Sequence, residues 1–231
     1  MLFGALGDIH GAFEEARRVI DRHPEVPFWL CVGDIATDEG RYEPLGAPVY
    51  WIHGNNDNFD AIAAGDLPLD LRYIPNGTAL DIGGLFRPGD HVRIAGLGGT
   101  FAPTWYETPA LALPHPKKGS ARATELADKR RHFVREHVEA SKALSGVDLL
   151  LTHEAAKPFR PLPGGRGPDA GKSQINEVLQ AMQPRLHLFG HHHRFSEQER
   201  EGVRSIGLDL VARSYLLIDS RSLEYEFHGT A

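Results

Sequence analysis

Five short blocks of this 231-residue chain combine carboxylate, amide and imidazole side chains, most of them beside glycine. They occupy residues 7–11, 33–35, 54–57, 152–154 and 190–193. Carboxylate and amide oxygens together with imidazole nitrogens are ligands for divalent cations. The chain has 13 histidines but a single cysteine, Cys31, which excludes thiolate clusters and disulfides within the chain. The spacing therefore predicts a metal site built from His, Asp and Asn.

The elements that must position these blocks are short apolar runs that predict buried strands. Runs at residues 2–6, 28–32, 49–52, 147–151 and 186–189 end at or just before a block. Helical periodicity at 13–20, 126–138 and 175–182 lies between them and indicates an α/β protein. Further strands at 78–82, 91–97, 203–206, 215–218 and 223–227 are expected as antiparallel additions. Because α/β sheets bind ligands at the carboxyl ends of their strands, the blocks are expected to meet at one rim.

The series of motifs resembles that of the calcineurin-like metallophosphoesterase superfamily over nearly the whole chain. The superfamily series is GDxHG, GDx, GNxD, a lone His after a strand, and GHxH, and the blocks above follow it in order. Residues 149–193 resemble the small bacterial phosphodiesterase branch. The resemblance implies a four-layer αββα sandwich of two mixed β-sheets flanked by helices. We expect residues 1–231 to form one such domain.

The resemblance also implies two divalent metal ions and assigns their ligands by position. The first ion would be held by Asp8, His10, Asp34 and His193. The second would be held by Asp34, Asn55, His153 and His191, so that Asp34 bridges the two. Manganese is expected, with iron, zinc, cobalt and nickel as alternatives for the same ligands. In an extended segment, His191 and His193 share one face and His192 faces away.

One position departs from the superfamily pattern. Most members carry His where this chain has Asn56, and that His is thought to protonate the leaving oxygen while the next Asp orients it. We assign the catalytic positions to Asn56 and Asp57, although an amide donates only a hydrogen bond. Loss of a general acid lowers the rate of hydrolysis most for substrates with poor leaving groups. The expected reaction is hydrolysis of activated or cyclic phosphodiesters by a hydroxide that bridges the two metals.

Two alternatives to a phosphodiesterase remain. One is a phosphomonoesterase or a protein or nucleotide phosphatase of the same superfamily. Protein phosphatases and diadenosine-tetraphosphate hydrolases extend the second block to GDxVDRG, and residues 33–40 lack that arginine. The other alternative is a non-catalytic interaction scaffold, like the retromer subunit that resembles this fold.

Two proline-rich segments, residues 100–122 and 157–171, are predicted to be lids or substrate loops. Trp105 could stack on a base or aryl group, and His115 and Arg160 could bind phosphate. The substrate would be a small phosphate ester or a nucleotide. Arg130 and Arg131 are interpreted as a solvated helix face.

Composition excludes several function classes. The chain has 25 Lys and Arg against 31 Asp and Glu, a net charge of −6, so strong nucleic-acid binding is not expected. We expect no membrane span because no run approaches about 20 apolar residues. The single cysteine and the early Asp8 favour a cytoplasmic protein. Composition leaves the oligomeric state open.

Overall fold

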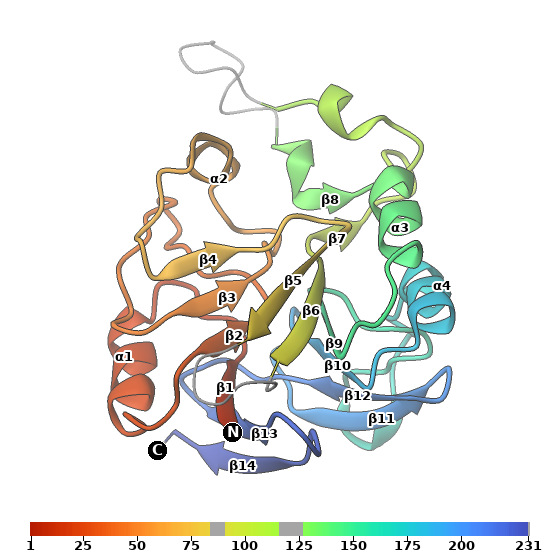
Figure 1. The fold of residues 1–231 in the computed structure, drawn as a ribbon. Helices are drawn as coiled ribbons and strands as arrows, with labels where there is room; N and C mark the ends of the chain where they lie inside the picture. Colours follow the sequence, from red (N-terminus) through yellow and green to blue (C-terminus); the bar gives the residue numbers. More distant parts are fainter. Residues whose placement is uncertain (84–90, 116–126, 231) are drawn as a thin grey trace.

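The computed structural model describes residues 1–83, 91–115 and 127–230, and within these ranges two six-stranded mixed sheets form the centre (Figure 1). The first sheet has the order β14-β13-β1-β2-β3-β4, with β1 to β4 parallel and β13 antiparallel to both its neighbours. Its strands are β1 (Leu2–Leu6), β2 (Trp29–Cys31), β3 (Val49–Trp51), β4 (Leu71–Tyr73), β13 (Ser214–Asp219) and β14 (Tyr225–Gly229).

The second sheet has the order β11-β12-β10-β9-β6-β5, with four parallel central strands and antiparallel strands at both edges. Its strands are β5 (Thr78–Gly83), β6 (His91–Leu97), β9 (Leu149–Thr152), β10 (Leu186–Phe189), β11 (Ser196–Arg200) and β12 (Val203–Gly207). A separate short parallel pair joins β7 (Thr100–Phe101) to β8 (His132–Phe133).

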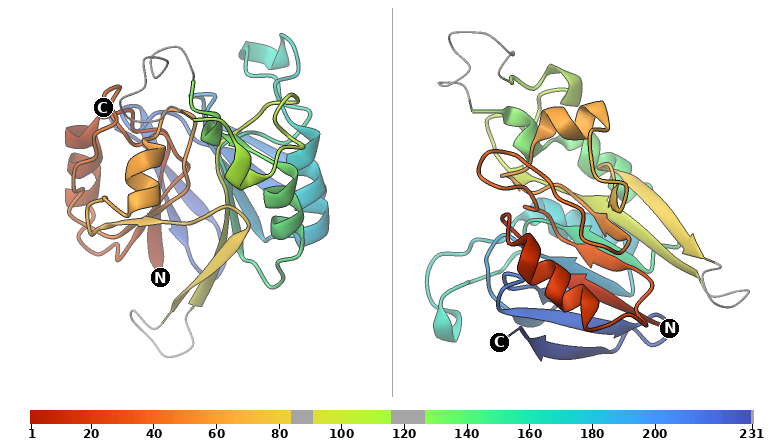
Figure 2. Two further views of the ribbon diagram at one scale, coloured as in Figure 1. Left: turned by 90° about the horizontal axis from the view of Figure 1, so that it is seen from above. Right: turned by 90° about the vertical axis from the view of Figure 1, so that its left-hand side faces the viewer.

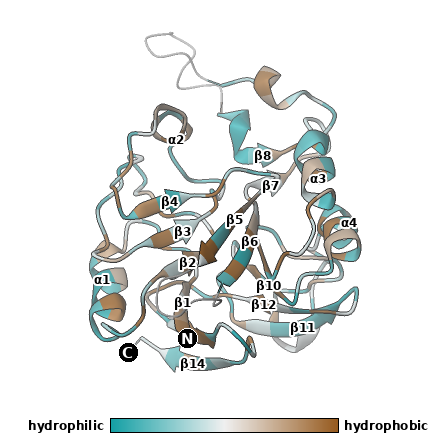
Figure 3. Cartoon of the chain, in the orientation of Figure 1, coloured by the Kyte–Doolittle hydropathy of each residue, from teal (hydrophilic) through white to brown (hydrophobic). Residues whose placement is uncertain are grey.

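Helices cover the outer faces of both sheets, which gives the four-layer αββα sandwich (Figure 2). The helix α1 (Phe13–Asp21) packs on the first sheet, while α3 (Arg135–Lys142) and α4 (Ser173–Met182) pack on the second. The α1 residues Phe13, Ala16, Val19 and Ile20 are buried, as the helical period predicts. Figure 3 shows hydrophobic and hydrophilic residues together on α1 and α4, consistent with one buried face each. The predicted fold class is confirmed.

Apolar side chains of both sheets meet in a shared core between them. Phe3 and Leu30 of the first sheet, and Ile52 directly after β3, belong to the same buried cluster as Leu149 and Leu188 of the second sheet. This packing brings the carboxyl ends of β1, β2, β3, β9 and β10 to a common rim, where all five motif blocks begin.

The predicted helix at 126–138 is wrong in its first part. Residues 129–131 form a single 3₁₀ turn, Phe133 lies in β8, and the α-helix begins only at Arg135. Phe133 is fully buried and pairs with Phe101 of β7, so tertiary packing overrides the helical pattern. Leu126 lies outside the described residues.

The strands β4 and β11 and the short helix α2 (Phe59–Ala64) were not predicted, and neither was the short strand pair β7–β8. The edge strand β11 has the sequence Ser-Glu-Gln-Glu-Arg, without a hydrophobic residue, and is held by backbone pairing with β12. Apolar periodicity cannot detect such a strand.

The two proline-rich segments are largely irregular where they are described. Residues 102–115 contain one 3₁₀ turn at Ala110–Ala112, and residues 116–122 of the predicted loop lie outside the described residues. The second segment contains a 3₁₀ turn at Pro163–Gly165. In the described part of the chain, every helix is too short or too polar to cross a membrane.

Candidate metal centre

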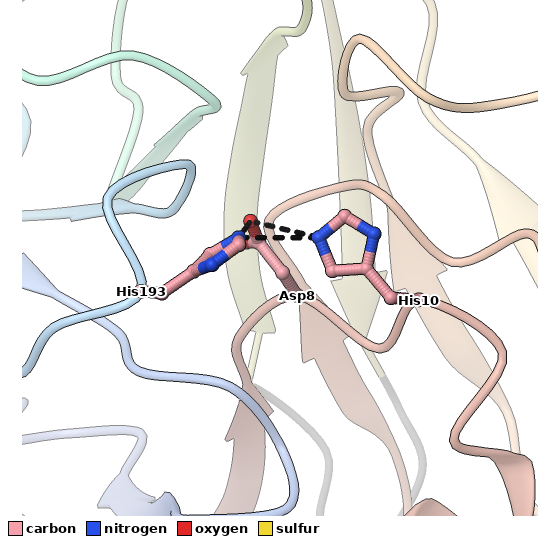
Figure 4. A group of neighbouring side chains, drawn as sticks. All are labelled: Asp8, His10 and His193. Carbon is pink, nitrogen blue, oxygen red and sulfur yellow. Dashed lines mark hydrogen bonds and ion pairs between the residues drawn. The ribbon is translucent and has the colours of Figure 1, made fainter. Parts of the chain in front are cut away.

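Two overlapping groups of ligand-type atoms lie at the rim of the two sheets. The first comprises Asp8, His10 and His193, and the second comprises Asp8, Asp34 and His153. In each group the candidate ligand atoms lie within 4.8 Å of one another. Figure 4 shows the first group, with the two imidazoles directed toward the same carboxylate.

In the first group, nitrogen atoms and carboxylate oxygens surround a small space. Nε2 of His193 lies 3.1 Å from Oδ2 of Asp8 and 3.1 Å from Nε2 of His10. Nε2 of His10 lies 3.9 Å from Oδ2 of Asp8 and 3.7 Å from Oδ2 of Asp34. The chemistry of this donor set fits a cation, because two imidazole nitrogens and two carboxylates offer lone pairs to one place.

The second group is formed by hydrogen-bond acceptors. Nδ1 of His153 donates to the carbonyl oxygen of Val32 at 2.8 Å, which assigns the proton of the neutral ring to Nδ1. Its Nε2 then presents a lone pair 3.2 Å from Oδ1 of Asn55 and 3.5 Å from Oδ2 of Asp34. One imidazole nitrogen, one amide oxygen and one carboxylate are ligand types that divalent cations bind, so these residues also fit a metal ion.

His191 lies beside the second group. Its ring centroid is 4.9 Å from that of His153, and its backbone N–H donates to the Asp8 carboxylate at 3.1 Å. Burial lowers the pKa of His191 to about 4, so the ring is neutral and able to ligate at neutral pH. The structure therefore brings all seven sequence-predicted ligands to one place.

Electrostatics couples Asp34 to His153. Burial alone would raise the pKa of Asp34, but the neighbouring His153 and the donor groups of Asn56 hold it below its ordinary value. Burial alone would lower the pKa of His153, but the carboxylates of Asp34 and Asp8 raise it. A positive charge is therefore stabilised between these side chains.

Strained backbone holds four of the candidate ligands. His10, Asp34, His191 and His193 have φ of 46°, 51°, 68° and 46°, in the left-handed region that L-residues rarely adopt. The expectation of an extended 191–193 segment is therefore wrong, although His192 does turn away and packs 4.5 Å from the Phe159 ring. Strain of this kind collects at functional sites.

Hydrogen bonds tie the first two ligand loops to each other. The carbonyl oxygen of Asp34 accepts the backbone N–H groups of Ile9 at 3.0 Å and His10 at 2.7 Å. Close packing excludes side chains at two glycines: a Cβ on Gly54 would lie 2.0 Å from Oδ1 of Asp34, and a Cβ on Gly190 would lie 2.3 Å from Oδ1 of Asp8.

Asp57 binds backbone groups. Its carboxylate accepts the N–H groups of Asp34, Ile35 and Ala36 at 2.9, 3.0 and 3.2 Å, and that of Gly54 at 2.7 Å. Burial and the Asp34 charge raise the pKa of Asp57 to about 6. These contacts join the second block to the third, a positioning role that the motif alone does not reveal.

A family model for the calcineurin-like phosphoesterase matches residues 1–195. The chain belongs to this family. A search of curated proteins by sequence gave no significant match.

Solved structures similar to this phosphoesterase confirm its fold. TT1561 of Thermus thermophilus is 13% identical with a TM-score of 0.67, and the match covers 100% of this chain and 99% of that one. Phosphopantetheinyl hydrolase from Mycobacterium tuberculosis is 15% identical with a TM-score of 0.51, covering 90% and 89%. GAP50, the anchor in the inner membrane complex of Plasmodium, is 13% identical with a TM-score of 0.52, covering 99% and 88%.

Arg131 lies beside the candidate ligand Asn55 in this phosphoesterase, which the sequence did not predict. The interpretation of Arg130 and Arg131 as a solvated helix face is wrong, because they lie in the 3₁₀ turn beside a cavity of about 260 Å³. Nη2 of Arg131 donates to the backbone oxygen of Asn55 at 2.7 Å and to Oδ1 of Asn56 at 3.5 Å. Arg130 instead pairs with carboxylates, at 2.7 Å from Asp60. No sequence motif marks Arg131.

The three predicted substrate-contact residues of the phosphoesterase lie apart from the seven candidate ligands. The Trp105 ring packs beneath Nζ of Lys129, 5.8 Å from the ring centroid. His115 makes a hydrogen bond with the carbonyl oxygen of Leu113 in its own loop, and Arg160 lines a different cavity. Among the described residues, the structure shows no contact between these three side chains and the ligand cluster.

Proposed function

We propose that this phosphoesterase holds two divalent cations and hydrolyses phosphodiesters. The observation that carries the proposal is the place of the Asp34 carboxylate, whose Oδ2 lies 3.7 Å from Nε2 of His10 and 3.5 Å from Nε2 of His153. Asp8, His10, Asp34 and His193 would hold one cation, and Asp34, Asn55, His153 and His191 the other. Manganese is favoured because carboxylate, amide and imidazole ligands occur together. When bound, such a pair of cations activates water and neutralises charge on the phosphoryl oxygens.

Asn56 orients the bridging carboxylate. Its backbone N–H donates to Oδ1 of Asp34 at 2.7 Å, and its side-chain Nδ2 donates to Oδ2 at 2.8 Å. The amide nitrogen that faces the site is therefore already engaged. Asn56 acts as a positioning residue, and protonation of a leaving oxygen is outside its chemistry.

Arg131 supplies a fixed positive charge next to this cluster. Arg131 lines the cavity of about 260 Å³, which is also lined by Asn56 and Phe59. A phosphate ester entering this cavity would meet the guanidinium fork, which binds phosphate oxygens in a bidentate manner. Because a guanidinium stabilises charge without giving up its proton, substrates with good leaving groups are favoured. Phosphodiesters with aryl or cyclic leaving groups meet this condition.

The substrate is a small phosphate ester or nucleotide, and residues 100–115 and 157–171 are proposed as its covering loops. A cytoplasmic location and a single domain over residues 1–231 complete the proposal.

Turnover of two aryl esters tests the proposal. With Mn²⁺ added, bis(4-nitrophenyl) phosphate should be hydrolysed at a higher kcat/KM than 4-nitrophenyl phosphate, and metal analysis should find two ions per chain. Faster turnover of the monoester would support the phosphomonoesterase alternative. Two bound ions with no turnover of either ester would support the scaffold alternative.

A further inference from the structure

A second cavity lies beside β11, and one of its lining residues, Phe159, packs on His192. It has a volume of about 280 Å³ and is lined by the 158–165 segment and by alternate residues around β11. These alternate residues are Arg194, Ser196, Gln198 and Arg200, which share one face because side chains alternate along a strand. We call this space the arginine cavity.

The opposite face of β11 is occupied by other contacts. Glu197 on that face pairs with Arg204 at 2.6 Å and accepts the hydroxyl of Tyr225. The acidic side chains of the strand are therefore directed away from the arginine cavity. The strand separates charge, with the carboxylates of Glu197 and Glu199 on one face and the guanidinium group of Arg200 on the other.

Three guanidinium groups line the arginine cavity without a carboxylate partner. Arg160, Arg194 and Arg200 have no ion pair within 4.0 Å in the part of the chain that the structure describes. Arg194 donates to the carbonyl oxygen of Pro161, and Nε of Arg200 donates to that of Pro158 at 3.1 Å. These neutral acceptors fix the guanidinium groups and leave their charge uncompensated.

The carboxylate of Asp169 acts on Arg160 and Arg200 only beyond ion-pair distance. Its Oδ1 accepts two backbone N–H groups at 2.8 and 3.0 Å, and its Oδ2 lies 3.9 Å from Nζ of Lys157. Asp169 is therefore engaged elsewhere, and the arginine cavity keeps a net positive charge.

Two residues that line the arginine cavity carry buried hydrogen-bond donors. Oγ of Ser196 and Nε2 of Gln198 are buried and have no hydrogen-bond partner among the described residues. Arg200 donates to Oε1 of Gln198, which assigns the amide nitrogen to the unpartnered position. A buried donor without a partner is unfavourable, so a ligand that accepts hydrogen bonds from both groups would be stabilised by them.

We propose that the arginine cavity binds an oxyanion of the phosphate type. Guanidinium groups, a hydroxyl and an amide N–H all donate to tetrahedral oxyanions. The volume suits one phosphate group with few attached atoms. The Phe159 ring lines the cavity and packs on His192, which stands in the sequence between the candidate ligands His191 and His193. The oxyanion is therefore either free phosphate or a second anionic group of a larger substrate that also reaches the ligand cluster.

Calorimetric titration with inorganic phosphate tests the proposal without any turnover. Chelator-treated wild-type protein should bind one phosphate per chain, and the double variant Arg160→Gln/Arg200→Gln should bind it at least about tenfold more weakly. The matched control is Arg204→Gln on the neighbouring strand, whose guanidinium pairs with Glu197 and Glu224, and it should bind phosphate as the wild type does. Circular dichroism verifies that each variant is folded.

A second variant separates this site from the metal centre. Asp34→Asn should keep phosphate binding although the proposed metal ligand is changed. Absence of binding to the folded wild type, or equal binding by the folded double variant, would overturn the proposal whatever the result for diester hydrolysis.

Kinetics with Mn²⁺ distinguishes the two sources of the oxyanion. If the arginine cavity holds part of the substrate, Arg200→Gln raises KM for a 4-nitrophenyl diester that carries a second phosphate and leaves KM for bis(4-nitrophenyl) phosphate unchanged. If it holds free phosphate, both KM values stay unchanged while phosphate binding weakens. An equal rise in both KM values with unchanged phosphate binding would contradict the assignment.

Discussion

Asn56 donates hydrogen bonds to both carboxylate oxygens of Asp34, through its backbone N–H at 2.7 Å and its side-chain amide at 2.8 Å. This pairing fixes the plane of the Asp34 carboxylate, which is also 3.7 Å from His10 and 3.5 Å from His153. One oxygen, Oδ2, faces both imidazoles. Asp34 is therefore the residue that both proposed cation sites share.

Asp34→Asn is expected to remove both ions. The amide of asparagine lacks the negative charge that would attract two cations. The number of metal ions bound per chain should therefore fall from two to none, and diesterase activity should be lost. The core between the sheets should keep the variant folded by circular dichroism. One tightly retained ion would show that Asp34 does not bridge.

Arg131→Gln should lower kcat/KM for bis(4-nitrophenyl) phosphate by about 100-fold, the usual cost of removing one donor that stabilises charge in the transition state. Arg130→Gln is the matched control, because Arg130 is already paired with Asp60 and Asp128. It should stay within tenfold of the wild type. Equal losses in the two variants would refute a specific role for Arg131.

Asp57→Asn should destabilise the protein by about 3 kcal/mol. Two carboxylate oxygens accept four backbone N–H groups, and an asparagine amide would turn one NH₂ group toward these donors. The measurement is the free energy of urea unfolding. Asp81→Asn, which breaks an exposed pair with Arg93, is the control and should cost at most about 1 kcal/mol. A similar small loss for Asp57→Asn would contradict its positioning role.

Acid should destabilise the fold through His187. Burial lowers its pKa to about 3 from an ordinary value of 6.5, and its ring makes hydrogen bonds with Thr152 and Ser205. The unfolded chain takes up a proton below pH 6.5 and the folded chain does not until near pH 3. The contribution of neutral His187 to the free energy of unfolding is complete above pH 6.5. As the pH falls from 6.5 toward 3, this contribution is lost at up to about 1.4 kcal/mol per pH unit.

The measurement is urea unfolding at several values between pH 7 and pH 4. His187→Gln removes this titration, so the slope of stability against pH should decrease although the variant is less stable at pH 7. An unchanged slope would mean that His187 is not buried in its neutral form.

Chelation should abolish turnover and leave the protein folded. The core between the sheets and the two outer clusters contain the large apolar side chains, so folding does not depend on metal binding. Far-ultraviolet circular dichroism before and after chelation should agree, and Mn²⁺ should restore activity. Loss of secondary structure on chelation would show that the ions are structural.

Sequence patterns predicted the strands around the site because buried strands are apolar runs that end abruptly at polar residues. Two of these runs, Leu2–Leu6 and Leu186–Phe189, match the observed strands residue for residue. The convergence of Asp8, Asp34 and His153 followed from the rule that ligands gather at the carboxyl ends of strands.

Other features depend on tertiary contacts that periodicity does not record. Arg131 comes from a turn held by the β7–β8 pair, far along the chain from Asn55, whose carbonyl oxygen it reaches. The left-handed backbone at His191 and His193 likewise arises from contacts with Asp8 and the neighbouring loops. The polar strand β11 has no apolar pattern at all.

The hydrogen bonds from Ile9 and His10 to the Asp34 carbonyl join the ligand loop at residues 7–11 to the ligand loop at residues 33–35, so the two loops should move together. An insertion or a shift in either loop would displace side chains assigned to both cations at once. Affinity for the two ions should therefore rise or fall together across variants, and a form with only one ion bound should be scarce during titration.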